Sequence, residues 1–270
     1  MLPLRSLALS RELPLPDVFP FSVPIIRALE TIEFQTPITL FAGDNGSGKS
    51  TLLEAIAIQA RMITVGSAGA HEDPTLALLR PLAARLKLTW SKKIRRGFFM
   101  RAEDFFGFAR RQAEQHAEML EDIAEIERSF AGRSAAAKGL AKMPYARELH
   151  DMQRLYGQGL DAGSHGESFF ALFRSRFIPN ALYILDEPEA PLSPTRQLAF
   201  LAMLQSTVAQ GAQFLIATHS PILLAYPGAT IYSCDGGMLR RVEYEDLEQI
   251  ALLRDFMNHT ESYLRQLFNP

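Results

Sequence analysis

The sequence predicts an α/β fold built on a mostly parallel central sheet, and three observations support this. An apolar strand candidate, ITLFA (38–42), leads into the glycine-rich segment GDNGSGKS and then into the helical pattern TLLEAIAI. Strand and helix patterns alternate from 165 to 218, which is typical of parallel strands joined by crossover helices. The stretch 102–156 is rich in Ala, Glu, Gln and Arg, which predicts a helical insertion.

The N-terminal half is expected to add an antiparallel β part. Residues 1–24 contain several prolines and are predicted to be extended, with one edge strand. Residues 25–42 predict two short strands that meet near 35–37, and a helix follows from about 48. Residues 66–81 predict a loop, and residues 85–101 predict a hairpin with a basic tip.

The C-terminal half is expected to carry the parallel strands. We predict a helix at about 165–177, a strand at 181–186, a helix at 194–209 and a strand at 213–218. A last hairpin (230–244) and a helical tail complete the chain. The organisation expected is one domain over 1–270, with a helical lobe inserted at 102–163.

The composition argues against several classes of protein, among them strongly basic nucleic-acid-binding proteins, disulfide-bonded proteins and membrane-spanning proteins. The 270 residues carry a formal net charge of -2, so no overall basic field draws the chain to nucleic acid or anionic lipid. One cysteine excludes an intramolecular disulfide and favours a reducing compartment. The sequence has no apolar run near the ~20 residues of a membrane span and no signal-peptide pattern, so we expect a cytoplasmic protein without membrane insertion.

The glycine-rich segment fits G-x-x-x-x-G-K-[ST], the pattern of a phosphate-binding loop. Glycines permit a tight turn whose N–H groups face an anion, and the following helix presents its positive end to the same charge. We expect a lysine ammonium on the β- and γ-phosphates of a nucleotide and a serine hydroxyl on Mg²⁺. The predicted binding residues are Gly43, Asp44, Asn45, Gly46, Ser47, Gly48, Lys49, Ser50 and Thr51.

Two further strands end in groups that suit phosphate chemistry. ALYILDEP places Asp186 and Glu187 at the end of a buried strand, and QFLIATHSP places His219 at the end of another. Ligand groups of parallel sheets gather at these carboxyl ends. Asp186 is therefore a predicted Mg²⁺ partner and Glu187 a predicted base for an attacking water, while His219 could reach the γ-phosphate. Lys49, Glu187 and His219 are the predicted catalytic residues.

These motifs, in this order, resemble the ABC-class ATPases, which include transporter ATPase subunits and the SMC/RecF-type ATPases. More narrowly, SHGESFF and YILDEPEAPLSP look like a group of stand-alone bacterial ATPases often called AAA family ATPases. The resemblance implies a P-loop NTPase fold of ABC-ATPase type, with ATP and Mg²⁺ as cofactors. It also implies an ATP-dependent homodimer, in which the signature segment 163–167 of one chain contacts the nucleotide of the other. Ser164, Gly166 and Glu167 are the signature residues concerned.

The sequence departs from the ABC pattern at several positions. His165 stands where the signature usually has glycine, and Ser193 ends the D-loop where transporters commonly have aspartate. A glutamine in the transporter Q-loop position is missing, and Glu103 is a candidate metal-side substitute or a surface residue. Ser164 and Glu167 also have the spacing of a helix capping box, so this segment could be a cap, a phosphate clamp, or both.

The function expected from these features is an ATP-hydrolysing switch that acts on an unidentified macromolecular partner, in DNA repair or phage defence. The alternatives are the nucleotide-binding subunit of an ABC transporter and a non-hydrolysing scaffold. A basic turn with Trp90 and Phe98 nearby could contact nucleic acid, although a solvated loop tip is the favoured interpretation. The turn contains Lys92, Lys93, Arg95 and Arg96.

Overall fold

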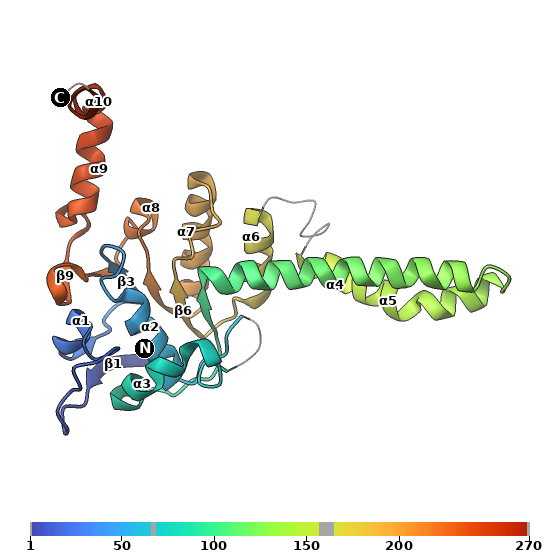
Figure 1. The fold of residues 1–270 in the computed structure, drawn as a ribbon, viewed down its shortest axis with the longest axis horizontal. Helices are drawn as coiled ribbons and strands as arrows, with labels where there is room; N and C mark the ends of the chain where they lie inside the picture. Colours follow the sequence, from blue (N-terminus) through green and yellow to red (C-terminus); the bar gives the residue numbers. More distant parts are fainter. Residues whose placement is uncertain (1, 66–68, 157–164, 269–270) are drawn as a thin grey trace.

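The main feature of the fold is a six-stranded sheet (Figure 1). The computed structural model describes residues 2–65, 69–156 and 165–268. The strand order is β5 (Phe99–Arg101), β6 (Leu182–Asp186), β7 (Gln213–Ala217), β3 (Ile38–Ala42), β8 (Thr230–Ser233) and β9 (Arg240–Val242). Every neighbouring pair is parallel except β8 and β9. The predicted α/β fold with a mostly parallel sheet is thereby confirmed, as is the C-terminal hairpin.

A smaller antiparallel sheet confirms the predicted N-terminal β part. Its order is β2 (Ile32–Glu33), β1 (Leu4–Leu9) and β4 (Leu86–Trp90). Both edges of β1 are paired, so the prediction of an edge strand within residues 1–24 is wrong. The side chains of Leu4 and Leu7 are fully buried, which explains why this strand lies in the middle of its sheet.

The predicted hairpin over 85–101 is also wrong. Strand β4 pairs with β1, whereas β5 pairs with β6 in the other sheet. The run Phe98–Met100 is buried throughout, which suits a covered parallel strand better than a hairpin arm. The backbone of Gly97 (φ 110°) passes so close to β6 that a Cβ there would lie 1.7 Å from the Leu182 carbonyl oxygen. The chain therefore crosses from one sheet to the other at this glycine.

Short helices lie in two regions that were predicted to be strand or loop. Helix α1 (Pro24–Arg27) occupies part of the predicted strand region 25–42, and η1 (Pro74–Leu79) and α3 (Arg80–Arg85) occupy part of the predicted loop 66–81. Each of these helices has proline at its first or second position. Proline is well tolerated there because the first helical N–H groups have no partner within the helix. Prolines in segments predicted to be extended or loop-like thus begin helices.

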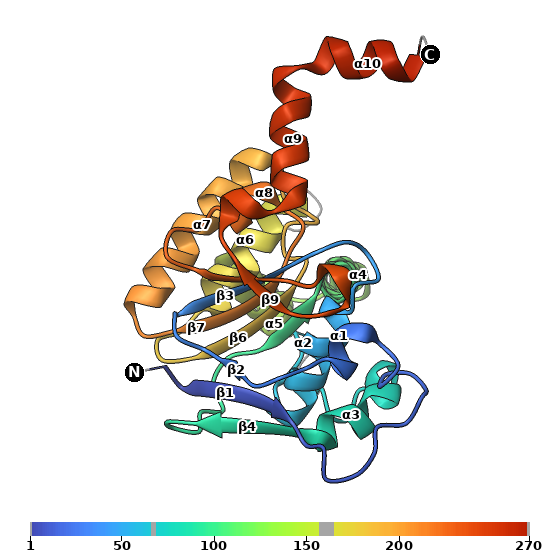
Figure 2. The ribbon, with the colours of Figure 1, turned by 90° about the vertical axis from the view of Figure 1, so that its left-hand side faces the viewer.

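Helix α2 (Lys49–Gln59) lies between the two sheets and forms the centre of one hydrophobic core (Figure 2). It contacts β6 and β7 of the large sheet and β4 of the small one. The second core covers the other face of the large sheet, where α6 (His165–Arg176), α7 (Pro194–Ala209) and α8 (Pro221–Leu224) contribute apolar side chains. Being enclosed on both sides fixes α2, and with it the loop from which it starts.

Two helical extensions leave this body. Helices α4 (Ala102–Ser129) and α5 (Ala135–Tyr156) pack against each other and extend far to one side (Figure 1). Helices α9 (Glu248–Asn258) and α10 (Thr260–Phe268) form a second extension at the C-terminal end. The helices predicted at 102–156 and in the C-terminal tail are confirmed. The short turns η2 (Asp235–Gly237) and η3 (Tyr244–Asp246) connect the last elements.

Candidate functional site

The glycine-rich loop joins the buried end of β3 to the first residue of α2, as the sequence predicted. Gly48 precedes the helix with φ 98°, and a Cβ at this position would lie 2.6 Å from Val23 Cγ1. Only glycine fits this backbone conformation and this space without strain. The helix begins without a side-chain cap, so its first N–H groups are not occupied by a capping side chain. Such a helix start is suited to an anion.

The loop curls around the ammonium group of Lys49. This buried Nζ donates hydrogen bonds to the carbonyl oxygens of Gly43, at 2.7 Å, and Asp44, at 2.9 Å. Asp235, which the sequence analysis did not single out, holds the loop from outside: its Oδ1 accepts a hydrogen bond from the Asp44 N–H at 2.9 Å. Asp235 reaches the loop because β8 runs parallel to β3, with Ser233 opposite Ala42.

Asp186 lies at the carboxyl end of β6, next to the loop. It is 6% exposed, and burial raises its pKa to about 6, with a hydrogen bond to Ser50 and the charge of Lys49 opposing the shift. Its Oδ1 is buried and accepts no hydrogen bond from the part of the chain that the structure describes. A buried carboxylate oxygen without a donor is an expensive feature, and a cation is one way to satisfy it.

Glu187 and His219 come together at the same edge of the sheet. Their side chains approach to 3.4 Å between Glu187 Oε1 and His219 Nε2, which is long for a hydrogen bond. Both remain accessible, with side-chain exposures of 41% and 31%, respectively. Glu187 adopts φ 51°, a left-handed conformation that costs energy for a non-glycine residue and is concentrated at functional sites.

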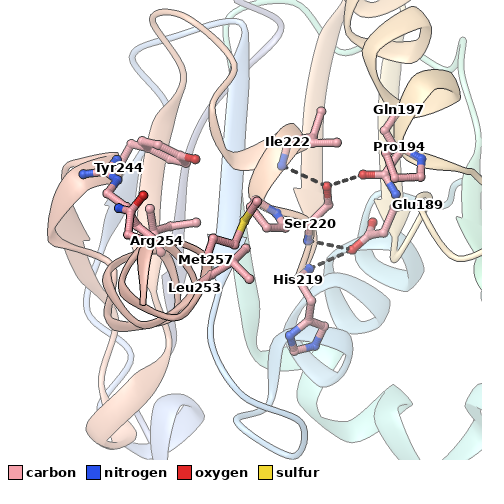
Figure 3. Close-up of a pocket in the computed structure, with 13 residues that line it drawn as sticks. Glu189, Pro194, Gln197, His219, Ser220, Ile222, Tyr244, Leu253, Arg254 and Met257 are labelled. Carbon is pink, nitrogen blue, oxygen red and sulfur yellow. Dashed lines mark hydrogen bonds between the residues drawn. The ribbon is translucent and has the colours of Figure 1, made fainter. Parts of the chain in front are cut away.

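Glu189 fixes the segment that carries His219, and the sequence analysis missed it. Its Oε1 accepts hydrogen bonds from the hydroxyl of Thr218 (2.7 Å) and from the N–H groups of His219 (2.7 Å) and Ser220 (3.1 Å). Figure 3 shows the two backbone contacts together with the Ser220–Gln197 bond. The available signal was the third acid in DEPE, to which the sequence pattern assigned no role.

Glu103, which the sequence offered as a metal-side substitute or a surface residue, lies at the surface. The Glu103 side chain is 71% exposed and forms an ion pair with Arg101 at 3.0 Å. A largely buried acid that interacts with Asp186 is instead Glu54 on α2, whose pKa is raised to about 7 by burial, with Arg101 opposing the rise and Asp186 adding to it. Neither Arg101 nor Glu54 was recognised from the sequence, because their ion pair joins two segments that are far apart in the chain.

The signature segment is only partly described. Ser164 lies outside the described residues, and Gly166 and Glu167 fall in the first turn of α6, where their side chains are not described. The choice between cap and clamp therefore stays a prediction. In the basic loop after β4, Phe98 is buried against Phe173, Phe177 and Tyr183, so its proposed contact with nucleic acid is excluded.

One family model matches the segment of the chain that contains the glycine-rich loop. Residues 21–58 match the family model described as an AAA domain. The matched segment runs from α1 through β3 and the glycine-rich loop to α2, and it supports the predicted resemblance to AAA-family P-loop ATPases there. Asp186, Glu187 and His219 lie outside it. A search of curated proteins found no match.

Solved structures of two kinds are similar to the chain. An Smc head domain from Pyrococcus furiosus, bound to the C-terminal domain of ScpA, is 11% identical with a TM-score of 0.46, covering 95% of this chain and 100% of that one. The ADP conformation of MJ1267, an ATP-binding cassette of an ABC transporter, is 16% identical with a TM-score of 0.46, covering 94% and 99%. The SMC head domain from Thermotoga maritima is 14% identical with a TM-score of 0.40, covering 90% and 99%.

Within the described ranges, none of the helices combines the length and apolar character needed to cross a bilayer.

Proposed function

We propose that the chain binds ATP with Mg²⁺ and hydrolyses it to ADP and phosphate. The observation that carries this proposal is the meeting of Glu187 and His219, 3.4 Å apart, beside the buried Asp186 and the glycine-rich loop. A loop that only connected β3 to α2 would not require a base and a histidine at the adjacent strand ends. Phosphoryl transfer depends mainly on positioning and charge stabilisation, and these residues supply both.

A magnesium ion fits the oxygen atoms at this edge. Asp186 offers a buried carboxylate oxygen that has no donor among the described residues, and Ser50 is its hydrogen-bonded neighbour. Mg²⁺ prefers oxygen ligands and commonly takes one or two protein oxygens together with phosphate oxygens. Ser50 and Asp186 would hold the ion, which would neutralise negative charge on the phosphates when bound.

The protein side chains then have separate roles. Lys49 exchanges its bonds to the Gly43 and Asp44 carbonyls for phosphate oxygens, and the N–H groups at the start of α2 add further donors. Glu187 accepts a proton from the attacking water, and His219, held through its backbone by Glu189, donates a hydrogen bond to the γ-phosphate. Because the side chains of Glu187 and His219 are both partly exposed, a nucleotide can reach this edge of the sheet without unfolding it, although the Nε2 atom of His219 is itself buried.

We further propose that ATP drives dimerisation and that the dimer acts as a switch on a macromolecular partner in the cytoplasm. The signature pattern in 163–167 supports the dimer, since the resembled class uses it on the nucleotide of a second chain. The α4–α5 pair supports a macromolecular partner, because it extends from the body and exposes apolar side chains. Leu120 is 50% exposed, Leu140 68% and Met143 56%.

Glu187→Gln tests the proposal. With ATP and Mg²⁺, this variant should release phosphate at least ~100-fold more slowly than the parent, since it lacks the base, and should accumulate as a dimer in light scattering. Lys49→Ala is the matched control and should neither bind ATP nor dimerise. A Glu187→Gln chain that binds ATP but stays monomeric at micromolar concentration would contradict the dimer. Unchanged phosphate release would contradict the assignment of Glu187.

A further inference from the structure

Helices α9 and α10 expose a group of large apolar side chains, which we call the arm face. The exposed fractions of these side chains range from 38% to 74%. On α10 the apolar positions are three and four residues apart, so they lie on one side of the helix. Exposed apolar surface gathered in one place marks an interaction site more often than an ordinary surface. The arm face consists of Leu252, Leu253, Met257, Leu264, Leu267 and Phe268.

Contacts at the corner between the two helices hold α10 at the far end of α9, away from the body (Figure 2). The Tyr263 hydroxyl donates a hydrogen bond to Asp255 Oδ2 at 2.6 Å, and His259 Nδ1 lies 2.9 Å from Asp255 Oδ1. The rings of Phe256 and Tyr263 meet edge to face with their centroids 5.5 Å apart. Because this corner is fixed, α10 does not fold back over the body, and its apolar side stays available to another molecule.

Two clefts beside α9 connect the arm face to the proposed catalytic edge. Their volumes are about 800 and 460 Å³, and both are lined by His219 and Pro221 of the body and by Leu253 of α9. Figure 3 shows Leu253 and Met257 beside the segment that carries His219. The arm face therefore continues into the sheet edge at which the proposed nucleotide lies.

The arm also projects toward the side on which the proposed dimer closes. Figure 1 shows α9 and α10 extending past the body on the side where α6 begins. The signature segment 163–167 overlaps the start of α6, and the resembled class places a second chain against this segment. Helix α9 alone has 11 residues and is about 16 Å long, so a second copy lying there is within reach of the arm.

The charges on the arm favour a second copy over a membrane or a nucleic acid. Helices α9 and α10 together carry two arginines and three acids. One of the arginines, Arg254, is already paired with Glu245 at 2.5 Å. Anionic lipid and nucleic acid instead attract surfaces rich in lysine and arginine. In a two-fold dimer the same surface of each copy faces the other, which suits an apolar face with balanced charges around it.

We propose that a second copy of this chain covers the arm face, and that this contact strengthens the ATP-dependent dimer from outside the nucleotide sites. This rests on the proposed function. Burial of the arm face removes apolar surface from water only when two copies meet. The arm therefore contributes to the affinity between the copies and leaves the affinity of a single chain for ATP unchanged.

The experiment compares an arm variant with a matched control, both in a Glu187→Gln background that prevents turnover. The arm residues to be changed are 70%, 68% and 74% exposed, so the folded single chain loses little packing. The control removes two body side chains that are 65% and 71% exposed. The arm variant carries Met257→Ser, Leu267→Ser and Phe268→Ser, and the control carries Leu13→Ser and Leu78→Ser.

Sedimentation velocity with ATP and Mg²⁺, over a range of chain concentrations, measures the Kd of the dimer. The arm variant should raise this Kd at least ~10-fold, whereas the control should stay within about threefold of the parent. Binding of a fluorescent ATP analogue to the dilute, monomeric chain should be the same in all three proteins.

Three results would overturn the inference. An arm variant that dimerises as tightly as the parent would overturn the arm contact alone and leave the proposed function standing. Binding of the parent to phosphatidylglycerol vesicles that the arm variant loses, with dimerisation unchanged, would assign the arm face to lipid. A parent that does not bind ATP, or binds it and stays monomeric, would overturn the proposed function and the arm contact with it.

Discussion

Replacing Asp186 with asparagine should stabilise the protein in the absence of nucleotide and Mg²⁺. The wild-type side chain is 6% exposed, and burial raises its pKa from 3.8 to about 6. Because the pKa is raised on folding, the contribution of Asp186 to stability is greatest below pH 3.8 and is lost as the pH rises through about 6. Asparagine has a similar shape without the charge, so it avoids this loss.

The size of the effect follows from the shift. One pKa unit corresponds to about 1.4 kcal/mol, so the rise from 3.8 to about 6 corresponds to about 3 kcal/mol at pH 8. At pH 5 the folded wild type is mostly protonated at Asp186, and integrating the same shift gives roughly half that value. For chains of about this size, 1 kcal/mol moves the unfolding midpoint by roughly 2–4 °C.

The assay is unfolding of wild type and Asp186→Asn by urea and by heat at pH 5 and pH 8, without metal or nucleotide. The stability gain should be larger at pH 8 than at pH 5, and Asp122→Asn on the exposed side of α4 should show no gain at either pH. Added Mg²⁺ and ATP should stabilise wild type and not Asp186→Asn. An equal gain at both pH values, or a loss at pH 8, would refute the view that Asp186 is a charge held in the folded state at a cost.

Three further substitutions test residues that shape or hold the proposed nucleotide site. Gly48→Ala should weaken ATP binding about tenfold or more, because the left-handed φ of 98° strains an alanine and Val23 Cγ1 occupies the space of its methyl group. Isothermal titration measures the affinity for ATP, and an unchanged affinity would contradict the prediction. Glu189→Ala should lower kcat roughly tenfold to a hundredfold with little effect on KM. Glu189→Gln keeps an accepting oxygen, so its kcat should stay near that of the parent. Equal losses of kcat in both variants would argue against a positioning role for Glu189. Asp235→Ala should raise the KM for ATP about tenfold by releasing the Asp44 N–H, with Asp235→Asn as the control that retains the acceptor.

The glycine-rich loop and the strands that flank the site could be predicted because their signals are local. Strand β3 and the start of α2 follow from an apolar run, a glycine pattern and a helical repeat, all within about twenty residues. Asp186 and His219 follow two further apolar runs, and parallel strands bring their carboxyl ends to one edge. The predicted meeting of these groups needed only the parallel arrangement, which the alternation of strand and helix already indicated.

Other features depended on pairing between distant segments. Strands β4 and β5 are neighbours in sequence but belong to different sheets, since β1 and β6 offer each a better partner than the other does. The side chain of Gln213 shows the same dependence, because it hydrogen-bonds both the N–H and the carbonyl of Leu4 and so ties the two sheets together. Local periodicity carries no information on such contacts.

By itself, the sequence predicted the chemistry that we propose for this protein: a loop shaped for phosphate, a carboxylate for a metal, and a base and a histidine at adjacent strand ends. Only the tertiary structure decided which charges support that chemistry. Glu189 holds the His219 segment, Asp235 holds the loop, and Arg101 joins Glu54 to the first turn of α4. A catalytic motif is recognisable because its residues are close in sequence, whereas supporting charges are selected by position in space and can come from any part of the chain.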